Sequence, residues 1–278
     1  MTEEQALQYV KTADEKTLKE LGKQYCVGFE LTDKIPSVFE SKIGGIPYFP
    51  TGAEIPYNSY GDQLRFLMQI NCSDIHGIDN YPQKGMLQFW IDIDDTWGMC
   101  DKNGKGFRVI YYSDIIDNHS VPQITELTEE DEEFFPLCGE YGIEFKPVME
   151  DTNKKSIAYN RVFCKYFNLL SDEKINYISD LKYKLHLSDK ILEDGVYANA
   201  CNYIHKIGGS PEFCQYDIRD SEEEQEKFDF QLLQLNSDFG RNFTKIMWGD
   251  AGICHFFINS GKLKNCNFSD INYHCDCC

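Results

Sequence analysis

Three aspartates and a tryptophan lie close together at the predicted end of a strand. Asp92, Asp94 and Asp95 shortly precede Trp97. Paired carboxylates can act as general acid and general base, or they can bind Mg²⁺ or Ca²⁺. The same residues are also typical of an exposed loop, in which Asp side chains accept hydrogen bonds from backbone amides. We favour the loop, and we retain Asp92, Asp94 and Trp97 as candidate ligand-binding residues.

A second group of residues with chemical potential closes the chain. The run from His274 to Cys278 places Cys275 and Cys278 at Cys-x-x-Cys spacing, and Cys266 and His255 are near in sequence. Such residues bind tetrahedral Zn²⁺ when a second pair completes the ligand set. The sequence holds no second Cys-x-x-Cys pair. We therefore predict no metal site, and we expect thiols that behave as small buried hydrophobic side chains.

The motifs that identify common enzyme classes are missing from the sequence. It contains no nucleophile elbow, no phosphate-binding loop, no His-Glu-x-x-His helix and no dinucleotide fingerprint. The segment Asp101–Gly106 superficially resembles a calcium loop, but Lys105 stands at a ligand position and Tyr112 replaces the final glutamate. The six histidines are scattered without ligand spacing. We predict no cofactor, and we assign no catalytic residue.

The charge balance restricts the kinds of partner. The chain has 46 Asp and Glu against 27 Lys and Arg, which gives 27 − 46 = −19 at pH 7. Nucleic acid and anionic membranes require clustered positive charge, so we exclude both as partners. The acidic runs 124–133 and 220–226 are predicted to lie in solvated loops or at a helix start. A basic protein is the partner that this charge favours, and the sequence does not indicate the oligomeric state.

The composition is that of a protein that folds around a sizeable core. Hydrophobic residues make up 42% of the 278 positions and charged residues 26%. A chain of this length buries about three quarters of its unfolded surface. The acidic N-terminal residues lack the basic and apolar regions of a signal peptide, and no apolar run approaches the ~20 residues of a membrane span. We expect a cytoplasmic protein whose twelve cysteines stay reduced.

Helices are predicted at the N-terminus and in the middle of the chain. Residues 2–25 begin with Thr2 and Gln5 at capping-box spacing and continue with apolar residues at three- and four-residue steps. Residues 171–194 show the same helical spacing, within a helical addition at about 155–195.

Short alternating runs from about residue 40 predict β-structure. The candidate strands are Leu64–Asn71, Met86–Ile93 and Phe107–Tyr112. Between the last two, Asn103-Gly104 predicts a tight hairpin turn with positive φ at both positions.

The most informative feature is that the chain repeats itself. Three segments recur in the same order, with offsets of 206 − 42 = 164, 232 − 67 = 165 and 252 − 85 = 167. The pairs of segments are 42–47 with 206–211, 67–71 with 232–236, and 85–91 with 252–258. This period is far longer than the ~20–50 residues of a solenoid unit, so it predicts one duplicated module.

Each repeated segment has a readable physical role. The paired glycines permit a backbone conformation that is closed to other residues. Gln69 and Gln234 lie between apolar neighbours, so we expect each amide to tie its strand to a neighbouring loop. Period-two alternation in the third pair of segments predicts one inward face per strand. The residues predicted to share these faces are Leu87, Phe89 and Ile91 in the first strand, and Cys254, Phe256 and Ile258 in the second.

These runs resemble the YwqG-like family of bacterial proteins of unknown function. The matching segments are 42–50, 66–71, 84–92, 247–250 and 276–277. The resemblance covers most of the chain from about residue 40 and implies a duplicated α+β fold. The family has no established reaction, so it supplies no catalytic residues. Some relatives occur near polymorphic-toxin genes, and this implies a toxin-neutralising role.

We predict an α+β, β-rich and internally duplicated fold: two similar antiparallel β-sheet modules with helices at the N-terminus and in the middle. Residues 1–278 are predicted to form a single compact domain. Its parts are a first module at 40–118, an acidic connection with a helical insertion at 119–199, and a second module at 200–278. Two such modules are expected to associate about a pseudo-twofold axis with a shared cleft.

Two functions fit this architecture. The first is a protein-binding module that takes a basic, toxin-like partner. The alternative is a small-molecule or metal-dependent enzyme with its site between the two modules. The candidate ligand-binding residues are Gln69, Asp92, Asp94, Trp97, Gln234, Trp248 and Asp250.

Overall fold

The computed structural model describes residues 2–188, 204–219, 221–240 and 243–277. The described strands are β1 (Lys23–Thr32), β2 (Lys42–Ile43), β3 (Arg65–Asn71), β4 (Met86–Ile91), β5 (Phe107–Tyr112), β6 (Tyr141–Asp151), β7 (His205–Gly208), β8 (Phe230–Asn236), β9 (Ile253–Ile258) and β10 (Ile271–Asp276). The described helices are α1 (Glu3–Leu21), α2 (Glu129–Phe134), α3 (Ile157–Leu170), α4 (Asp180–Tyr183), α6 (Glu222–Lys227) and α7 (Ser260–Lys264), with a 3₁₀ turn at Cys72–Asp74. This content agrees with the predicted β-rich α+β class.

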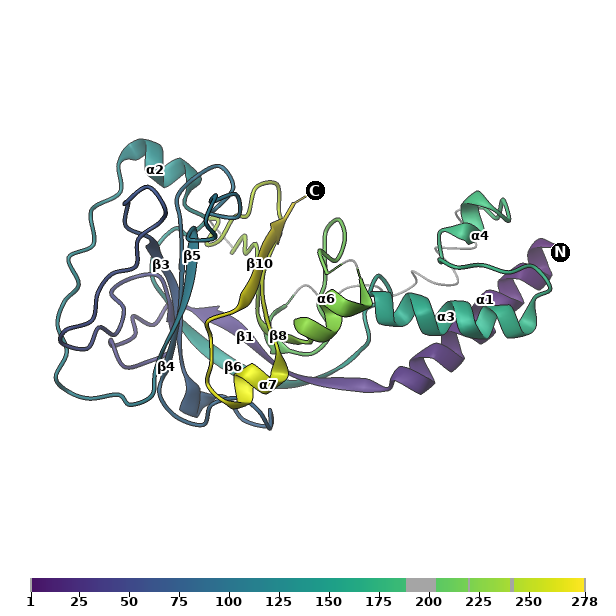
Figure 1. The fold of residues 1–278 in the computed structure, drawn as a ribbon, viewed down its shortest axis with the longest axis horizontal. Coiled ribbons are helices and arrows are strands. Elements are labelled where there is room, and N and C mark those ends of the chain that lie inside the picture. The colour runs from purple at the N-terminus through teal and green to yellow at the C-terminus, as the bar shows by residue number, and fades with distance from the viewer. Residues whose placement is uncertain (1, 189–203, 220, 241–242, 278) are drawn as a thin grey trace.

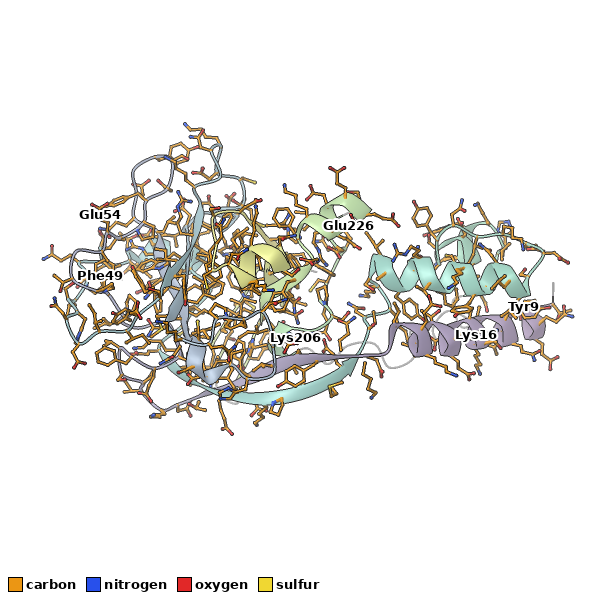
Figure 2. All side chains as sticks on the ribbon, turned by 60° about the horizontal axis from the view of Figure 1, so that its bottom comes forward. Tyr9, Lys16, Phe49, Glu54, Lys206 and Glu226 are labelled. Atoms are coloured by element: carbon orange, nitrogen blue, oxygen red, sulfur yellow. The ribbon has the colours of Figure 1, made fainter. Side chains whose placement is uncertain are left out.

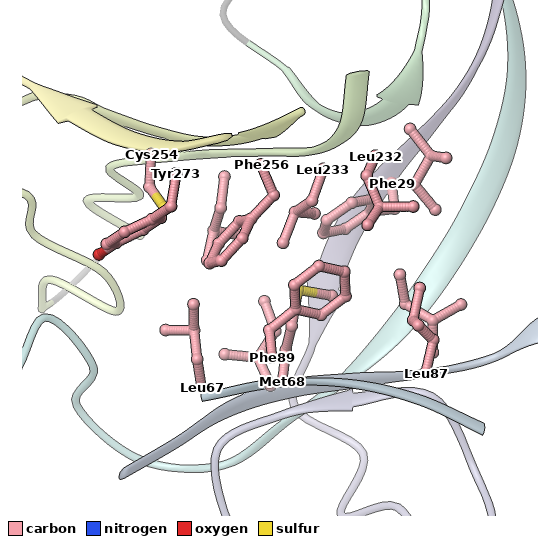
Figure 3. Packing of buried hydrophobic residues seen from close by; sticks show 14 of the residues in the cluster. Phe29, Leu67, Met68, Leu87, Phe89, Leu232, Leu233, Cys254, Phe256 and Tyr273 are labelled. Carbon is pink, nitrogen blue, oxygen red and sulfur yellow. The ribbon is translucent and has the colours of Figure 1, made fainter. Parts of the chain in front are cut away.

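The ten strands form one antiparallel sheet in the order β10-β9-β8-β7-β1-β6-β2-β3-β4-β5. We call β2–β5 the first leaf and β7–β10 the second leaf. The long central strands β1 and β6 pair from Lys23 with Asp151 to Thr32 with Gly142, and they join the two leaves (Figure 1). The sheet curls into a nearly barrel-shaped arrangement, because the leaves face each other across a common core (Figure 3).

Aromatic side chains from both leaves meet in this common core. The rings of Phe89 on β4 and Phe256 on β9 are 4.9 Å apart, and those of Phe107 and Tyr273 are 4.8 Å apart. The predicted alternation of β4 and β9 is confirmed, because the side chains assigned to their inward faces belong to this cluster. On the opposite faces, Trp90 packs with Leu64 and Phe66, and Phe257 packs with Phe213 and Phe228.

The predicted strands are present, but the predicted hairpin turn is wrong. β4 and β5 do pair as an antiparallel hairpin. Their connection is a long loop, and Gly104 has a φ of +66° whereas Asn103 does not have a positive φ. The reason is local: the Asp101 carboxylate accepts hydrogen bonds from the amides of Asn103 and Lys105, and it thereby builds a capped turn within the loop.

The helix predictions are correct in kind and partly wrong in extent. α1 has the expected capping box of Thr2 and Gln5, but it ends before Gly22, and the next residue already belongs to β1. The middle helix α3 precedes the predicted segment 171–194 and ends at Leu170, with Ser171 as its C-cap. Of that segment, the described part contains only the short helix α4, and residues 189–194 lie outside the described residues.

The helices α1, α3 and α4 form an arm beside the curled sheet, with a separate core of its own. Ala6, Val10, Phe163 and Phe167 are buried there. In Figure 2 the labelled Tyr9 and Lys16 lie on the arm, whereas Lys206 lies on the sheet. Among the described residues, no helix combines the length and the apolar character that a membrane crossing requires.

Corresponding positions of the two leaves have matching backbone features. Gly44 and Gly45 have φ values of +66° and +70°, and Gly208 and Gly209 have +72° and +71°. Lys42 lies opposite Gln69 in the first leaf, as Lys206 lies opposite Gln234 in the second. Both β3 and β8 shift register by one residue near their first residues.

Candidate functional site

A hollow of about 710 Å³ lies where the two leaves meet the acidic connection, and we call it the junction hollow. The first leaf contributes Gly44, Gly45 and Arg65, and the loop before β9 contributes Thr244 and Gly249. Its apolar lining includes Phe66, Trp97, Ile124, Leu127, Phe134 and Met247.

Trp97 forms one wall of the junction hollow. The turn that carries it is held by Asp94, whose carboxylate accepts hydrogen bonds at 2.8 Å from the amides of Thr96 and Gly98. The indole Nε1 of Trp97 donates to the carbonyl oxygen of Phe134 at 2.8 Å. The loop between β4 and β5 is therefore fastened to the end of α2.

The acidic connection is fastened to the second leaf as well. The amide of Cys138 donates to the carbonyl oxygen of Lys245 at 2.9 Å, and the amide of Met247 donates to that of Pro136 at 2.8 Å. Leu137 and Ile246 form an antiparallel bridge between the two segments. Segments far apart in the sequence thus build one continuous wall.

The predicted candidates Trp97 and Trp248 are brought together. Their rings are 5.5 Å apart at an interplanar angle of 86°, an edge-to-face contact. Trp248 is fully buried, and its Nε1 has no hydrogen-bond acceptor in the part of the chain that the structure describes. The Tyr273 hydroxyl of β10 donates to the carbonyl oxygen of Trp97 at 2.9 Å. Both tryptophans therefore sit at the junction of the two leaves.

The helix α2 places carboxylates at the rim of the junction hollow. Its capping box pairs the Thr128 hydroxyl with the amide of Asp131, and the Asp131 carboxylate with the amide of Thr128. These hydrogen bonds lower the pKa of Asp131. Glu132 and Glu133 are exposed and line the hollow, and neither forms an ion pair among the described residues.

Arg65 lies between the junction hollow and a second, smaller one. Only 7% of its surface is exposed, and it lines both hollows. Its Nη1 donates to the carbonyl oxygen of Thr125, and no described residue accepts a hydrogen bond from its Nε. Burial lowers the pKa of the Arg65 guanidinium, and the charges of Asp131 and Asp92 partly offset this effect.

The second hollow, of about 550 Å³, contains Asp92 and Asp94. Asp92 is buried and accepts hydrogen bonds from the Asn58 amide group at 2.8 Å and from the amide of Ile93 at 2.9 Å. Burial nevertheless raises the pKa of Asp92. The carboxylate of Asp94 is occupied by the turn around Thr96, as the loop interpretation expects.

The two predicted glutamines lie outside the junction hollow and connect strands to loops. Gln69 accepts a hydrogen bond from the amide of Tyr48 at 2.7 Å and donates to the carbonyl oxygen of Glu40 at 2.8 Å. Gln234 accepts from the amide of Glu212 at 2.9 Å. The expected role of both amides in tying a strand to a loop is confirmed. Asp250 is exposed and lines neither hollow, although its neighbour Gly249 lines the junction hollow.

Of the C-terminal cysteines, Cys275 packs into the core, whereas Cys277 is partly exposed. Cys275 lies directly opposite Cys254, and both are buried free thiols beside Tyr273. Burial raises the pKa of Cys254 well above its usual value. Within the described ranges, no three His, Cys, Asp or Glu side chains are arranged to hold a metal ion, and Cys278 lies outside those ranges.

Sequence reasoning missed Arg65, Glu132 and Glu133 as residues of the hollow. Arg65 directly precedes the apolar run of β3, and a single arginine at such a position is typical of the end of a strand. The usable signal was the comparison of the repeats: with the 165-residue offset, the position that matches Arg65 is Phe230. A charge present in only one of two matched strands points to a role beyond the fold.

Comparison with known proteins gives one family match. A family model described as a domain of unknown function, DUF1963, matches residues 41–277. A search of curated proteins finds no match.

Proposed function

Because the chain belongs to the DUF1963 family, whose description assigns no activity, we propose its function from its own geometry: a protein-binding module that receives part of a basic partner in the junction hollow. The single observation that carries this proposal is an apolar, aromatic-lined hollow whose rim bears unpaired carboxylates. Trp97, fastened at both its backbone and its indole, is a rigid contact surface of the kind that binding sites favour.

The size and lining of the junction hollow support binding. Pockets of about 300–1,000 Å³ with mainly apolar walls and a few polar groups are typical of ligand sites. The volume of about 710 Å³ falls within this range. Phe134 is 40% exposed at its rim, so an aromatic surface is presented to solvent there.

The charge around the hollow supports a basic partner. Glu132 and Glu133 stand at its rim, and the whole chain carries a net charge of −19. Complementary charge accelerates encounter and excludes acidic competitors. A toxin-like protein rich in Lys and Arg has the surface that fits.

One observation favours the alternative, a small-molecule enzyme with its site between the modules. Asp92 lies in the second hollow with a pKa raised by burial, and such groups occur at catalytic sites. Against this alternative, the Asp92 carboxylate already accepts hydrogen bonds from the Asn58 side chain and from the backbone amide of Ile93. The Asp94 carboxylate accepts a hydrogen bond from the amide of Thr96 within its own turn. We therefore rank binding above catalysis.

We also propose that the two leaves arose by duplication, that the chain belongs to the YwqG-like group, and that it is cytoplasmic. Duplication is supported by the matched positive φ values at Gly44 and Gly208 and by the matched register shifts of β3 and β8. Cytoplasmic location is supported by Cys254 and Cys275, which lie opposite each other as free thiols.

Labelled peptides that pair an aromatic residue with either lysines or glutamates test the binding role. Fluorescence polarisation is expected to detect the lysine peptides and not the glutamate peptides. The double variant Glu132→Gln/Glu133→Gln is expected to weaken binding about three- to tenfold and to flatten its salt dependence. The control, Glu223→Gln/Glu226→Gln, makes the same charge change on the exposed face of α6 and is expected to bind as the wild type. Equal losses in both variants would refute the junction hollow as the site.

A further inference from the structure

Arg65 is a nearly buried cation with unused hydrogen-bonding capacity. Its Nη1 donates to the carbonyl oxygen of Thr125, and its Nε is buried without a hydrogen-bond acceptor among the described residues. No described carboxylate lies within ion-pair distance of the guanidinium, although Asp131 and Asp92 are near enough to influence its pKa. Burying a charge without a partner is costly, so an acceptor supplied from outside would stabilise this site.

The sheet itself does not require this arginine. In the second leaf the matching position is Phe230, and β8 keeps the same register shift and the same pairing with its neighbour. We therefore attribute the presence of an arginine at position 65 to the junction hollow and not to the sheet. Arg65 lines the junction hollow together with Trp97 and Glu133.

The surroundings select the kind of anion. Asp131 and Asp92 influence Arg65, and Glu132 and Glu133 line the same hollow. A doubly charged phosphate would meet strong repulsion from these carboxylates, whereas a carboxylate carries a single charge and matches the planar guanidinium. The rim glutamates require, in addition, positive charge elsewhere on the same ligand.

We infer that the junction hollow receives the C-terminal end of a basic polypeptide chain, with its terminal carboxylate on Arg65. The last side chain of that polypeptide then packs against Trp97 and Phe134, and the basic residues that precede it lie near Glu132 and Glu133. This inference rests on the proposed binding function and names the part of the partner that binds. A chain end combines, in one small unit, a carboxylate, an adjacent apolar side chain and basic residues upstream.

The test uses one pair of peptides that differ only at their ends. Both have the sequence Lys-Lys-Ala-Ala-Phe with a fluorescent N-terminal label; one ends in a free carboxylate and the other in an amide. With the wild-type protein, the free acid is expected to bind at least about tenfold more tightly, the effect of one charge-assisted hydrogen bond. This comparison needs no variant, so it stands even where a substitution at Arg65 disturbs folding.

The variant Arg65→Gln sharpens the test. It is expected to abolish the preference for the free acid while both peptides still bind, a pattern that a general loss of structure does not produce. Arg108→Gln, which removes the same charge at a position outside the junction hollow, is expected to retain the preference.

The outcomes separate the two proposals. Equal binding of acid and amide that still depends on Glu132 and Glu133 would overturn the role of the chain end and leave the binding module intact. A persistent preference for the acid in Arg65→Gln would overturn the assignment to Arg65. Failure of both peptides to bind at millimolar concentration would overturn the inference and the proposed function together.

Discussion

At the scale of single residues, two lysines, Lys42 and Lys206, are buried, and each needs a partner for its charge. Lys206 is fully buried, and its Nζ lies 2.8 Å from Glu150, 2.7 Å from the carbonyl oxygen of Ser210 and 3.8 Å from Glu212. Lys42 is paired in a similar way with Glu140 at 2.7 Å. Each buried lysine is therefore paired with at least one carboxylate, and the carboxylates around Lys206 are the more buried ones.

Replacing Lys206 with methionine is expected to be strongly destabilising. The substitution removes the cation that pairs with the buried carboxylate of Glu150, and removal of one partner of a buried ion pair typically costs about 3–5 kcal/mol. Urea denaturation measures the loss. The exposed pair of Lys146 and Glu30 provides the control, because Lys146→Met is expected to cost less than about 1 kcal/mol. Equal costs would show that the burial of Lys206 has no energetic role.

The raised pKa of Asp92 predicts a pH dependence of stability. Between the unfolded value of about 3.9 and the higher folded value, the folded protein keeps a proton that the unfolded chain has lost. The contribution of Asp92 to stability is therefore largest at low pH and declines as the pH rises through this range. We expect Asp92→Asn to gain stability relative to the wild type as the pH rises from 4 to 7.

Denaturation profiles of the two proteins over this pH range provide the measurement. The exposed neighbour Asp95→Asn serves as the control and is expected to run parallel to the wild type. A constant difference between Asp92→Asn and the wild type at all pH values would contradict the assignment.

Some residues that the sequence singles out lie together in the structure, and these are residues of distinctive type. Trp97 and Trp248 are large aromatic residues, and their rings are in contact. Gln69 and Gln234 were recognised as buried amides, but their partners are loops of their own leaves. Arg65 depends on segments about 60 residues away, such as Thr125, and no local pattern reports such a contact.

At the scale of elements, the helical arm is a local unit with its own core. Phe163 is fully buried there between α1 and α3 and stacks near Tyr159 and Phe167. Phe163→Ala is expected to destabilise the arm by about 3–5 kcal/mol. Hydrogen exchange followed by mass spectrometry should show faster exchange in α1 and α3, with β4 and β9 nearly unchanged. Uniform acceleration over the whole chain would mean that arm and sheet unfold as one unit.

Strands with a regular alternation were predictable, and the two central strands were not. β6 lies inside the segment 119–199, which was assigned to a connection with a helical insertion, and β1 begins inside the helix predicted at 2–25. Both strands expose part of their length, and they are held by pairing with each other over a separation of more than a hundred residues. Local patterns carry little information about such a partner.

The described part of the segment 171–194, up to residue 188, does not form one continuous helix, and the reason is local. Ile175, Ile178 and Leu181 have helical spacing because they pack into the arm. The Asp180 carboxylate, however, accepts a hydrogen bond from the amide of Asn176 and caps a turn there. The helical spacing of these apolar residues therefore reflects their packing into the arm, and the backbone around Asn176 does not continue as a helix.

At the scale of the whole molecule, the contact between the leaves joins the two ends of the sheet. Phe89 and Phe256 form its aromatic centre, with ring centroids 4.9 Å apart (Figure 3). A double-mutant cycle with alanine at both positions is expected to give a coupling energy of about 0.5–1.5 kcal/mol. The cycle of Phe89 with Phe163, which belongs to the arm, is expected to be additive within about 0.5 kcal/mol. Coupling of the same size in both cycles would contradict a direct contact.

The strand β1 has a practical consequence, because it lies before the residues that the family model matches. That match begins at residue 41, whereas β1 (Lys23–Thr32) occupies the middle of the sheet between β6 and β7. In a truncated protein starting at residue 41, β6 and β7 would become unpaired edge strands. Unpaired edge strands can pair with strands of other molecules. Such a truncation is expected to aggregate on expression, so domain boundaries for this family are better drawn from strand pairing than from sequence similarity.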